Sequence, residues 1–392
     1  MIAKLESIIR DWDAQGIHRA GLTGEKLSGE WLIAQIHQLG GQTTCQHFDF
    51  TRICIDSALP TSALTIGREV ISGLPLFDAP ETNREGVTGR VVPLGEVGEI
   101  GYVELTPDAA TLKDEPFSML RRRSLHRAIV VATRVRGAGI APLNARHFPY
   151  TYGVPVLQVA GSEASRLAGY AAIGGVANLR VCYGYVPATS FNILSVVESP
   201  QTKLPPLVVV TPRTSWFTST AERAGGIAIW LHIMQSVLQE KSNLHRDVWF
   251  VATAGHEIGH IGIATFISAY PILRNALWLH LGANLGAAID TRLTLRASDD
   301  NHAVEMLRAL SAAGYDGEQI ETGMANHCVG EARDIVESGA KVISMVARNK
   351  YFHSPDDRLP HAVSLPNVEA ICRATLQFVP SLYLRQRAVL AD

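Results

Sequence analysis

The chain has 392 residues, which is too long for one ordinary core and suits two or more units. Hydrophobic residues make up 47% and charged residues 18%, so a large core can form and global disorder is excluded. With 35 Lys and Arg against 37 Asp and Glu, the formal net charge is -2. A near-neutral chain without a basic block gives no support for a nucleic-acid or anionic-membrane partner.

The first residues, MIAKLESIIRDWDAQ, predict an amphipathic helix with acidic residues inside it, and they lack the apolar segment of a signal peptide. No stretch of about 18 uncharged apolar residues predicts a membrane span. The five cysteines are scattered and include no CxxC pair, which argues against a disulfide framework and a structural zinc knuckle. We therefore expect a cytoplasmic protein.

Residues 1–56 are expected to contain two helices and a strand. Apolar residues recur at helical spacing from Leu5 to Trp12 and again from Trp31 to Leu39, where two glycines follow. From residue 57 to 188 the pattern changes to short β-type runs, such as GVTGRVVPL and HRAIVVATRV, that alternate with glycine and proline. This second stretch predicts a smaller β-rich domain.

From about residue 192 onward, continuous apolar strands alternate with amphipathic helices. The strand candidates include LPPLVVVTP, HRDVWFVATAG, ALWLHLGA and AKVISMVA. The pattern predicts an α/β fold with a mostly parallel sheet sandwiched by helices. Such sheets bind ligands at the carboxyl ends of their strands. The polar segments that follow the strands are therefore the candidate site: residues 211–216, 255–260, 282–287 and 348–357.

The run from His256 to His260 matches HExxH. On a continuous helix over residues 255–265, this spacing would place both imidazoles on one face as zinc ligands, with Glu257 as general base. However, the motif directly follows a strand, and glycines surround it. Glycine costs ~1 kcal/mol per helical site, which favours a loop. Ordinary loop histidines bonded to the backbone are the alternative.

A second constellation uses three different strand ends. Glu222, Glu257 and His353 supply two carboxylates and one imidazole, which suits a zinc site with one position open to water. Each residue also has a simpler interpretation by itself. Glu222 could be an acid favoured by a helix N-terminus, and His353 could be a turn residue before a Ser-Pro pair.

Residues ~192–379 resemble metallopeptidase family twenty-eight, the zinc exopeptidases of the bacterial leucyl aminopeptidase type. The order and spacing of VVVTPRTSW, ERAGGIA, VATAGHEIGHIG, LHLGANLG and YFHSPDD carry the resemblance. Residues ~57–188 resemble the protease-associated domain that many members carry as an insertion. The resemblance implies a zinc aminopeptidase-like domain formed by residues 1–56 and 189–392, interrupted by a β-rich insertion over 57–188.

The resemblance also implies a reduced metal site. Family members usually bind two metals, but Pro212 or Arg213 stands where the first metal has its histidine, and Gly282 stands where it has its aspartate. The positions of the second metal hold the bridging acid Glu222, together with Glu257 and His353. One zinc ion is therefore the expected cofactor.

His256 stands where the family has its general base, and an imidazole with a pKa near 6.5 can also accept a proton at neutral pH. It could equally be a fourth ligand, with His260 or His280 near the pocket rim. Arg213 could supply positive charge to a substrate carboxylate or an oxyanion, or it could be a surface residue with an acidic partner. The candidates for substrate binding are Ser215, Trp216 and Tyr351.

These features predict a single-zinc hydrolase of amide, peptide or related acyl bonds, acting on a small molecule or a short peptide. Loss of the metal pair argues against simple aminopeptidase activity. Glutaminyl cyclases share the fold and work with one zinc, so acyl transfer is one alternative. A non-catalytic binding protein is another, because the transferrin receptor ectodomain resembles this combination of domains without being a peptidase. A homo-oligomer is left open.

Overall fold

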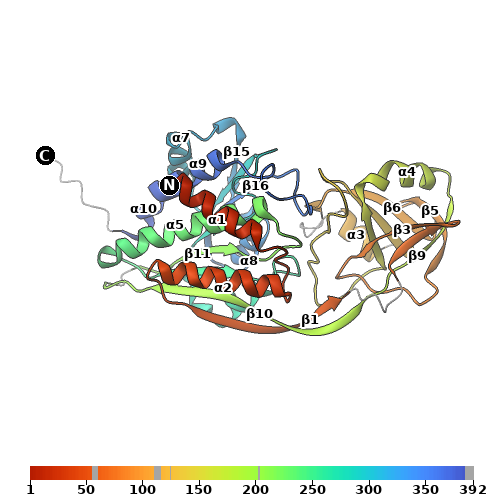
Figure 1. Ribbon diagram of the computed structural model, residues 1–392, viewed down its shortest axis with the longest axis horizontal. Helices are drawn as coiled ribbons and strands as arrows, with labels where there is room; N and C mark the ends of the chain where they lie inside the picture. Colours follow the sequence, from red (N-terminus) through yellow and green to blue (C-terminus); the bar gives the residue numbers. More distant parts are fainter. Residues whose placement is uncertain (55–60, 110–115, 124, 202–203, 385–392) are drawn as a thin grey trace.

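The computed structural model describes residues 1–54, 61–109, 116–123, 125–201 and 204–384. Within these residues the chain forms two sheets of eight strands each. We refer to the part around the first sheet as the α/β domain and to the part around the second as the insertion. Figure 1 shows them side by side, with the α/β domain at the left and the insertion at the right.

The first sheet has the strand order β1-β10-β12-β11-β13-β16-β14-β15. Its strands are β1 (Thr44–Cys54), β10 (Gly184–Val197), β11 (Leu207–Pro212), β12 (Val248–Thr253), β13 (Leu277–Leu281), β14 (Leu293–Ala297), β15 (Ile320–Met324) and β16 (Lys341–Ala347). The four central strands, from β12 to β16, run parallel, and antiparallel neighbours flank them on both sides. Every residue of β11 is buried, as a strand covered on both faces requires.

Helices cover both faces of this sheet. They are α1 (Ile2–Ala14), α2 (Thr23–Gln38), α5 (Gly225–Gln239), α6 (Ile261–Ala269), α7 (Asp300–Ala312), α8 (Glu331–Glu337), α9 (Leu365–Phe378) and α10 (Pro380–Tyr383). Val209 packs in a core cluster with α1, α5 and α9, whereas its neighbours Val208 and Val210 pack with α6 and α8 on the opposite face. The predicted sheet between helical layers is confirmed. No helix in the described ranges is long and apolar enough to cross a membrane.

The insertion contains the second sheet, with the order β3-β2-β9-β5-β6-β7-β8-β4. Its elements are β2 (Ala63–Ile66), β3 (Glu69–Ser72), β4 (Leu74–Pro75), β5 (Val87–Pro93), β6 (Ile100–Leu105), α3 (Pro116–Arg122), β7 (Ala128–Thr133), β8 (Val156–Ala160), α4 (Ala164–Ala172) and β9 (Val176–Arg180). Val130 packs with α4, while Ile129 and Val131 pack with α3. The insertion therefore has apolar clusters of its own on both faces of its sheet.

The strands β1 and β10 connect the two parts (Figure 1). They pair antiparallel in an unbroken register from Thr44 opposite Leu194 to Cys54 opposite Gly184. The predicted boundary at 188/189 falls inside β10, and the one at 56/57 lies outside the described residues. A long two-stranded ladder, not a single flexible linker, thus leads into the insertion.

A buried ion pair attaches helix α2 to the sheet. Arg213, directly after β11, places Nη2 2.8 Å from Glu25 Oε1, and both side chains are almost fully buried. Arg213 also donates to the Phe191 carbonyl oxygen, and Gly21 N and Ser190 Oγ donate to Glu25. The predicted role of Arg213 at a substrate is therefore wrong, and so is a surface location, because its guanidinium is used inside the fold.

Glu25→Ala should lower the free energy of unfolding by about 3–5 kcal/mol, because it leaves the Arg213 charge buried without its partner. Chemical denaturation measures the change. Glu30→Ala is the control, because Glu30 lies on the same helix in an exposed pair with Lys26, and it should change stability by less than about 0.5 kcal/mol. Equal effects of the two substitutions would contradict a stabilising role for the buried pair.

Candidate functional site

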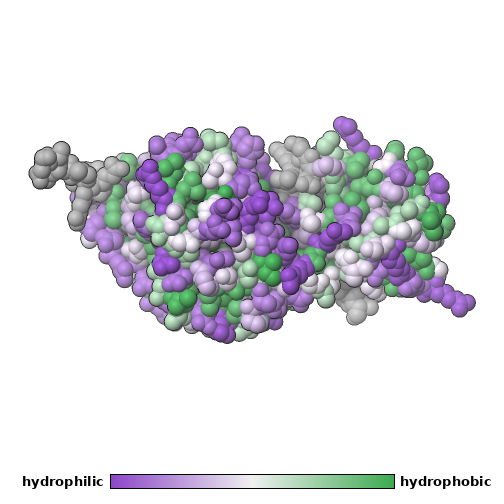
Figure 2. All heavy atoms as spheres, turned by 90° about the horizontal axis from the view of Figure 1, so that it is seen from above, coloured by the Kyte–Doolittle hydropathy of each residue, from purple (hydrophilic) through white to green (hydrophobic). Residues whose placement is uncertain are grey.

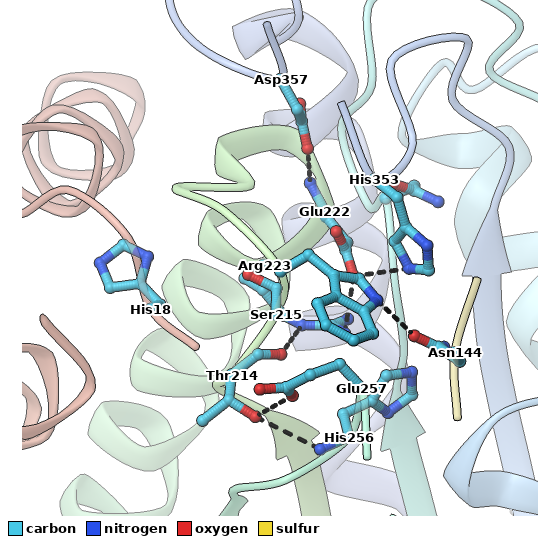
Figure 3. Close-up of polar contacts among 12 residues, drawn as sticks. His18, Asn144, Thr214, Ser215, Glu222, Arg223, His256, Glu257, His353 and Asp357 are labelled. Carbon is cyan, nitrogen blue, oxygen red and sulfur yellow. Dashed lines mark hydrogen bonds and ion pairs between the residues drawn. The ribbon is translucent and has the colours of Figure 1, made fainter. Parts of the chain in front are cut away.

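The parallel strands β11, β12, β13 and β16 bring their carboxyl ends to one edge of the sheet. The polar segments singled out in the sequence follow these ends. Figure 3 shows His256, Glu257 and His353 from these segments together with Glu222 and Arg223, which lie in the turn before α5. The candidate site therefore lies at this edge of the sheet.

Glu222 lies in a π-helical turn, Thr220–Ala224, that leads into α5. Ala221 N and Glu222 N both donate to the carboxylate of Asp357, each at 3.0 Å, and these bonds set the direction in which the helix starts. Burial and the nearby charge of Glu222 raise the pKa of Asp357 to about 8, although the two backbone bonds act in the opposite direction. Burial also raises the pKa of Glu222, and the charge of Arg223 opposes it.

Glu222 faces an arginine and a histidine (Figure 3). Arg223 Nη2 lies 2.7 Å from Glu222 Oε1, and Arg223 Nε donates to the Thr214 carbonyl oxygen at 2.7 Å. His353 Nε2 lies 3.7 Å from Glu222 Oε1, while His353 Nδ1 donates to the Pro142 carbonyl oxygen of the insertion. Burial, assisted by the charge of Arg223, lowers the pKa of His353 to about 3, so the imidazole is neutral. The charged partner of Glu222 is therefore a guanidinium.

Glu257 does not face this group. Its Oε1 accepts a hydrogen bond from Ala20 N at 2.7 Å, and its Oε2 accepts one from Thr214 Oγ1 at 2.7 Å. Thr214 Oγ1 in turn accepts a bond from Gly255 N. The carboxylate of Glu257 thus connects the N-terminal segment with the loop after β11.

The predicted zinc site is consequently not assembled. Glu222 and His353 approach each other, but Glu257 is bonded elsewhere. Within the described chain, no group of three or more His, Cys, Asp and Glu side chains is placed to hold a metal ion. Two nitrogen and oxygen donors beside a buried guanidinium do not match the three protein ligands that a catalytic zinc ion needs.

The HExxH segment is not helical. Residues 256–260 form turns, with positive φ at Gly255, Gly259 and His260, and α6 begins only at Ile261. The zincin interpretation is therefore wrong, because it required one continuous helix. The rings of His256 and His260 stack with centroids 4.5 Å apart, and neither histidine faces Glu222 together with His353 as a metal-binding group.

Helix α8 supplies acidic partners that the sequence analysis missed. His256 Nδ1 lies 3.3 Å from Glu331 Oε1, and His260 Nδ1 lies 2.6 Å from Asp334 Oδ2. Burial raises the pKa of Glu331 to about 8 and lowers the pKa of His256 well below its usual value. The only signal in the sequence was that Glu331 and Asp334 lie three residues apart, which puts them on one helix face.

The predicted substrate-binding residues are packed into the fold. Ser215 Oγ donates to the Phe217 carbonyl oxygen, and Trp216 Nε1 donates to Asn144 Oδ1 of the insertion. The Trp216 ring also packs edge-on against Phe77 of the insertion, at 5.0 Å between centroids. Tyr351 is buried. This corrects the prediction for Ser215 and Trp216, because the Ser215 hydroxyl is used inside the α/β domain and the Trp216 indole is used where the two domains meet.

A cavity of about 870 Å³ lies between the two domains. From the insertion it is lined by residues 106–109 and 134–136 and by Asn144; from the α/β domain it is lined by His256, His260, His280, Asn284 and residues 346–350, among others. His280 Nδ1 bonds with Ser344 Oγ, while no described residue hydrogen-bonds the buried His280 Nε2. Figure 2 shows hydrophilic residues gathered where the domains meet. The volume is in the range of small-molecule sites.

Residues of the N-terminal segment, among them His18, contact the loop that follows β11. His18 N donates to the Phe217 carbonyl oxygen, and His18 Nδ1 donates to the Thr218 carbonyl oxygen at 2.9 Å. The His18 ring lies against Trp12, with centroids 3.8 Å apart. Burial lowers the pKa of His18 to about 4, so this histidine is neutral in the folded chain.

Glu257→Ala should lower the free energy of unfolding by about 2 kcal/mol, because it leaves Ala20 N and the Thr214 hydroxyl without their acceptor. Chemical denaturation in the presence of EDTA measures the loss. Glu318→Ala, at an exposed acid, is the control. If Glu257→Ala is as stable as this control in EDTA but loses a zinc-dependent stabilisation, Glu257 is a metal ligand and not a structural group.

The pH dependence of stability tests the neutral state of His18. Its pKa is lower in the folded chain than in the unfolded chain, so its contribution is complete above about pH 6.5 and is lost as the pH falls toward 4. Between about pH 7 and 5, the wild-type chain should lose about 2 kcal/mol more than His18→Gln. Parallel curves for wild type and His18→Gln would contradict this assignment.

Comparison with known proteins supports the fold. The sequence matches no family model and no curated protein. Among solved structures, the zinc aminopeptidase BSAP from Bacillus subtilis has a TM-score of 0.75 at 16% identity, covering 99% of this chain and 96% of that one. The aminopeptidase from Aneurinibacillus sp. strain AM-1 has a TM-score of 0.71 at 15% identity, covering 100% and 96%.

A peptidase M28 precursor from Shewanella amazonensis SB2B has a TM-score of 0.71 at 16% identity, covering 97% of this chain and 94% of that one. These matches span both domains in almost full length. At such low identity the likeness concerns the arrangement of the chain and not its chemistry. The resemblance to metallopeptidase family twenty-eight is confirmed for the fold, which is that of the zinc aminopeptidases with an inserted domain.

Proposed function

We propose that this chain is a metal-free ligand-binding protein built on the zinc aminopeptidase fold. The observation that carries the proposal is the ion pair between Arg223 and Glu222, with 2.7 Å between Nη2 and Oε1. If the resemblance holds residue by residue, Glu222 corresponds to the bridging acid of the family. In this chain, that acid has a permanent cation from the neighbouring residue.

Electrostatics support this proposal. An arginine does not lose its proton in a protein, so the positive charge of Arg223 is fixed. A divalent ion beside Glu222 would be repelled by this charge in a site where Glu222 and Arg223 are fully buried and screening is weak. Glu257 would also have to release Ala20 N and Thr214 Oγ1 before it could act as a third ligand.

The cavity supports a binding role. It is large enough for a small molecule or a short peptide, and it combines polar groups such as His256 and Asn284 with apolar walls such as Val346 and Phe352. Because both domains contribute to its lining, a ligand would contact both. The alternatives, a single-zinc hydrolase and a glutaminyl cyclase-like acyl transferase, both need zinc, so one test separates them from the binding function.

Purified protein that has been incubated with zinc chloride and desalted should contain far less than one zinc per chain by elemental analysis. Glu222→Gln should lower the free energy of unfolding by about 3 kcal/mol, because it leaves Arg223 buried without a counter-charge. The loss should be the same in EDTA and in zinc. Glu198→Gln, at an exposed acid, is the matched control and should change neither quantity.

The opposite result would favour the interpretation of this protein as a zinc enzyme. It consists of one zinc per chain, lost in both Glu222→Gln and His353→Ala, together with zinc-dependent hydrolysis of an aminoacyl p-nitroanilide. Hydrolysis that persists in EDTA would also contradict a purely binding function. In that case the protein is an enzyme whose chemistry does not need the ion.

A further inference from the structure

We infer that the cavity binds a small organic anion, whose charge is held by Arg136, Arg348 and Lys350 at the junction of the two domains. The inference names the ligand class of the binding function proposed above and rests on that proposal. It is carried by three features: the unpaired charges around the cavity, their position on both domains, and a buried imidazole atom without a partner.

Positive charge exceeds negative charge among the described residues that line the cavity. They include five Lys and Arg residues and three Asp and Glu residues. Two of the cations are used, since Arg134 pairs with Glu104 and Arg296 pairs with Glu321. The other three, which form no ion pair with any described carboxylate, are Arg136, Arg348 and Lys350.

The remaining acids do not cancel these charges. Glu321 is the partner of Arg296. The charge of Asp108 acts on His353, where it opposes the larger effects that lower the pKa of this histidine. Asp290 is a further acid in the lining. Asp108 and Asp290 therefore remain beside three exposed cations that form no ion pair with a described carboxylate. Arg136 lies over the Tyr351 ring, and the charge of Arg348 helps to lower the pKa of Glu321. A ligand with one or more negative charges would balance the lining, whereas a ligand with a free amine would add to the excess.

The three cations come from both domains, and a backbone hydrogen bond links two of them. Arg136 N, in the insertion, donates to the Lys350 carbonyl oxygen at 2.9 Å. Arg348 N donates to the Arg292 carbonyl oxygen at 3.0 Å. The planar guanidinium groups of Arg136 and Arg348 match carboxylate and phosphate oxygens in two-point contacts.

His280 is an independent indication of a ligand. Its side chain is 1% exposed and lines the cavity, and its Nε2 atom has no hydrogen-bond partner in the described chain. Buried polar atoms are nearly always paired, so a polar ligand atom or water is expected against this nitrogen. Apolar lining such as Val135 and Phe352, together with a volume of about 870 Å³, favours an organic anion over a simple inorganic one.

Isothermal titration calorimetry of the full chain tests the inference with four probes: citrate, phenyl phosphate, inorganic phosphate and leucinamide. Citrate or phenyl phosphate should bind more tightly than inorganic phosphate. The ratio of the dissociation constants of citrate and phenyl phosphate shows whether the site prefers carboxylate or phosphate groups. Leucinamide, which carries the free amine of an aminopeptidase ligand, should not bind. Affinity for the anionic probe should fall as sodium chloride is raised, because exposed charges are screened.

Arg348→Gln and Lys350→Gln should each weaken binding of the anionic probe by about tenfold, the usual effect of losing one charge-assisted hydrogen bond. Arg274→Gln is the control, because Arg274 is exposed and precedes β13 at the opposite edge of the sheet. Melting curves establish that each variant is folded. If one of the two cavity variants does not fold, the other decides the outcome.

The inference is overturned if none of the three anionic probes binds, if leucinamide binds more tightly than they do, or if Arg348→Gln and Lys350→Gln bind the anionic probe like Arg274→Gln. These outcomes are independent of the zinc measurement. If the protein contains no zinc and binds none of the anionic probes, the proposed binding function stands but the anionic ligand class is wrong. A zinc-loaded chain loses that function, while titration in EDTA still decides whether the cavity takes anions.

Discussion

The ion pair between Glu222 and Arg223 is the interaction on which the strand-end site depends. A buried carboxylate is stable only when an opposite charge or several donors compensate for lost water. At this position the compensating charge belongs to the chain itself. Asp357 holds the turn that presents both residues, and His353 stays neutral beside them. The charge of Glu222 is therefore balanced without an ion from solution, although neither of its carboxylate oxygens has a hydrogen-bond partner among the described residues.

Positions that the family resemblance connects with metal chemistry serve the fold in this protein. Arg213 joins α2 to the sheet through Glu25, and Glu257 joins the N-terminal segment to the loop after β11. These contacts close the deep part of the site. The open part is the cavity between the domains, where three cations and the Nε2 atom of His280 have no ion-pair or hydrogen-bond partner among the described residues. The carboxyl edge of the sheet thus carries both the buried ion pairs and the accessible cavity.

Much of the fold followed from periodicity. Continuous apolar runs identified the central strands, and the helix patterns near both ends were equally regular, because burial on one or two faces leaves a direct mark on composition. The location of the site at the strand ends followed for the same reason. Its chemistry did not. Arg223 was overlooked because adjacent residues of an ordinary helix do not face each other, whereas a π-helical turn here brings both inward.

The central strands, the β-rich stretch and the edge where polar residues gather were thus encoded in local pattern, which survives without knowledge of distant contacts. The order of the strands across the sheet came only from the folded chain. Only the folded chain decided which way the polar side chains point. Glu257 turns toward Ala20 rather than Glu222, and His256 meets Glu331, a residue distant in sequence. A difference in side-chain direction separates a metal site from a structural hydrogen-bond network, and such directions depend on contacts between segments that no local pattern records.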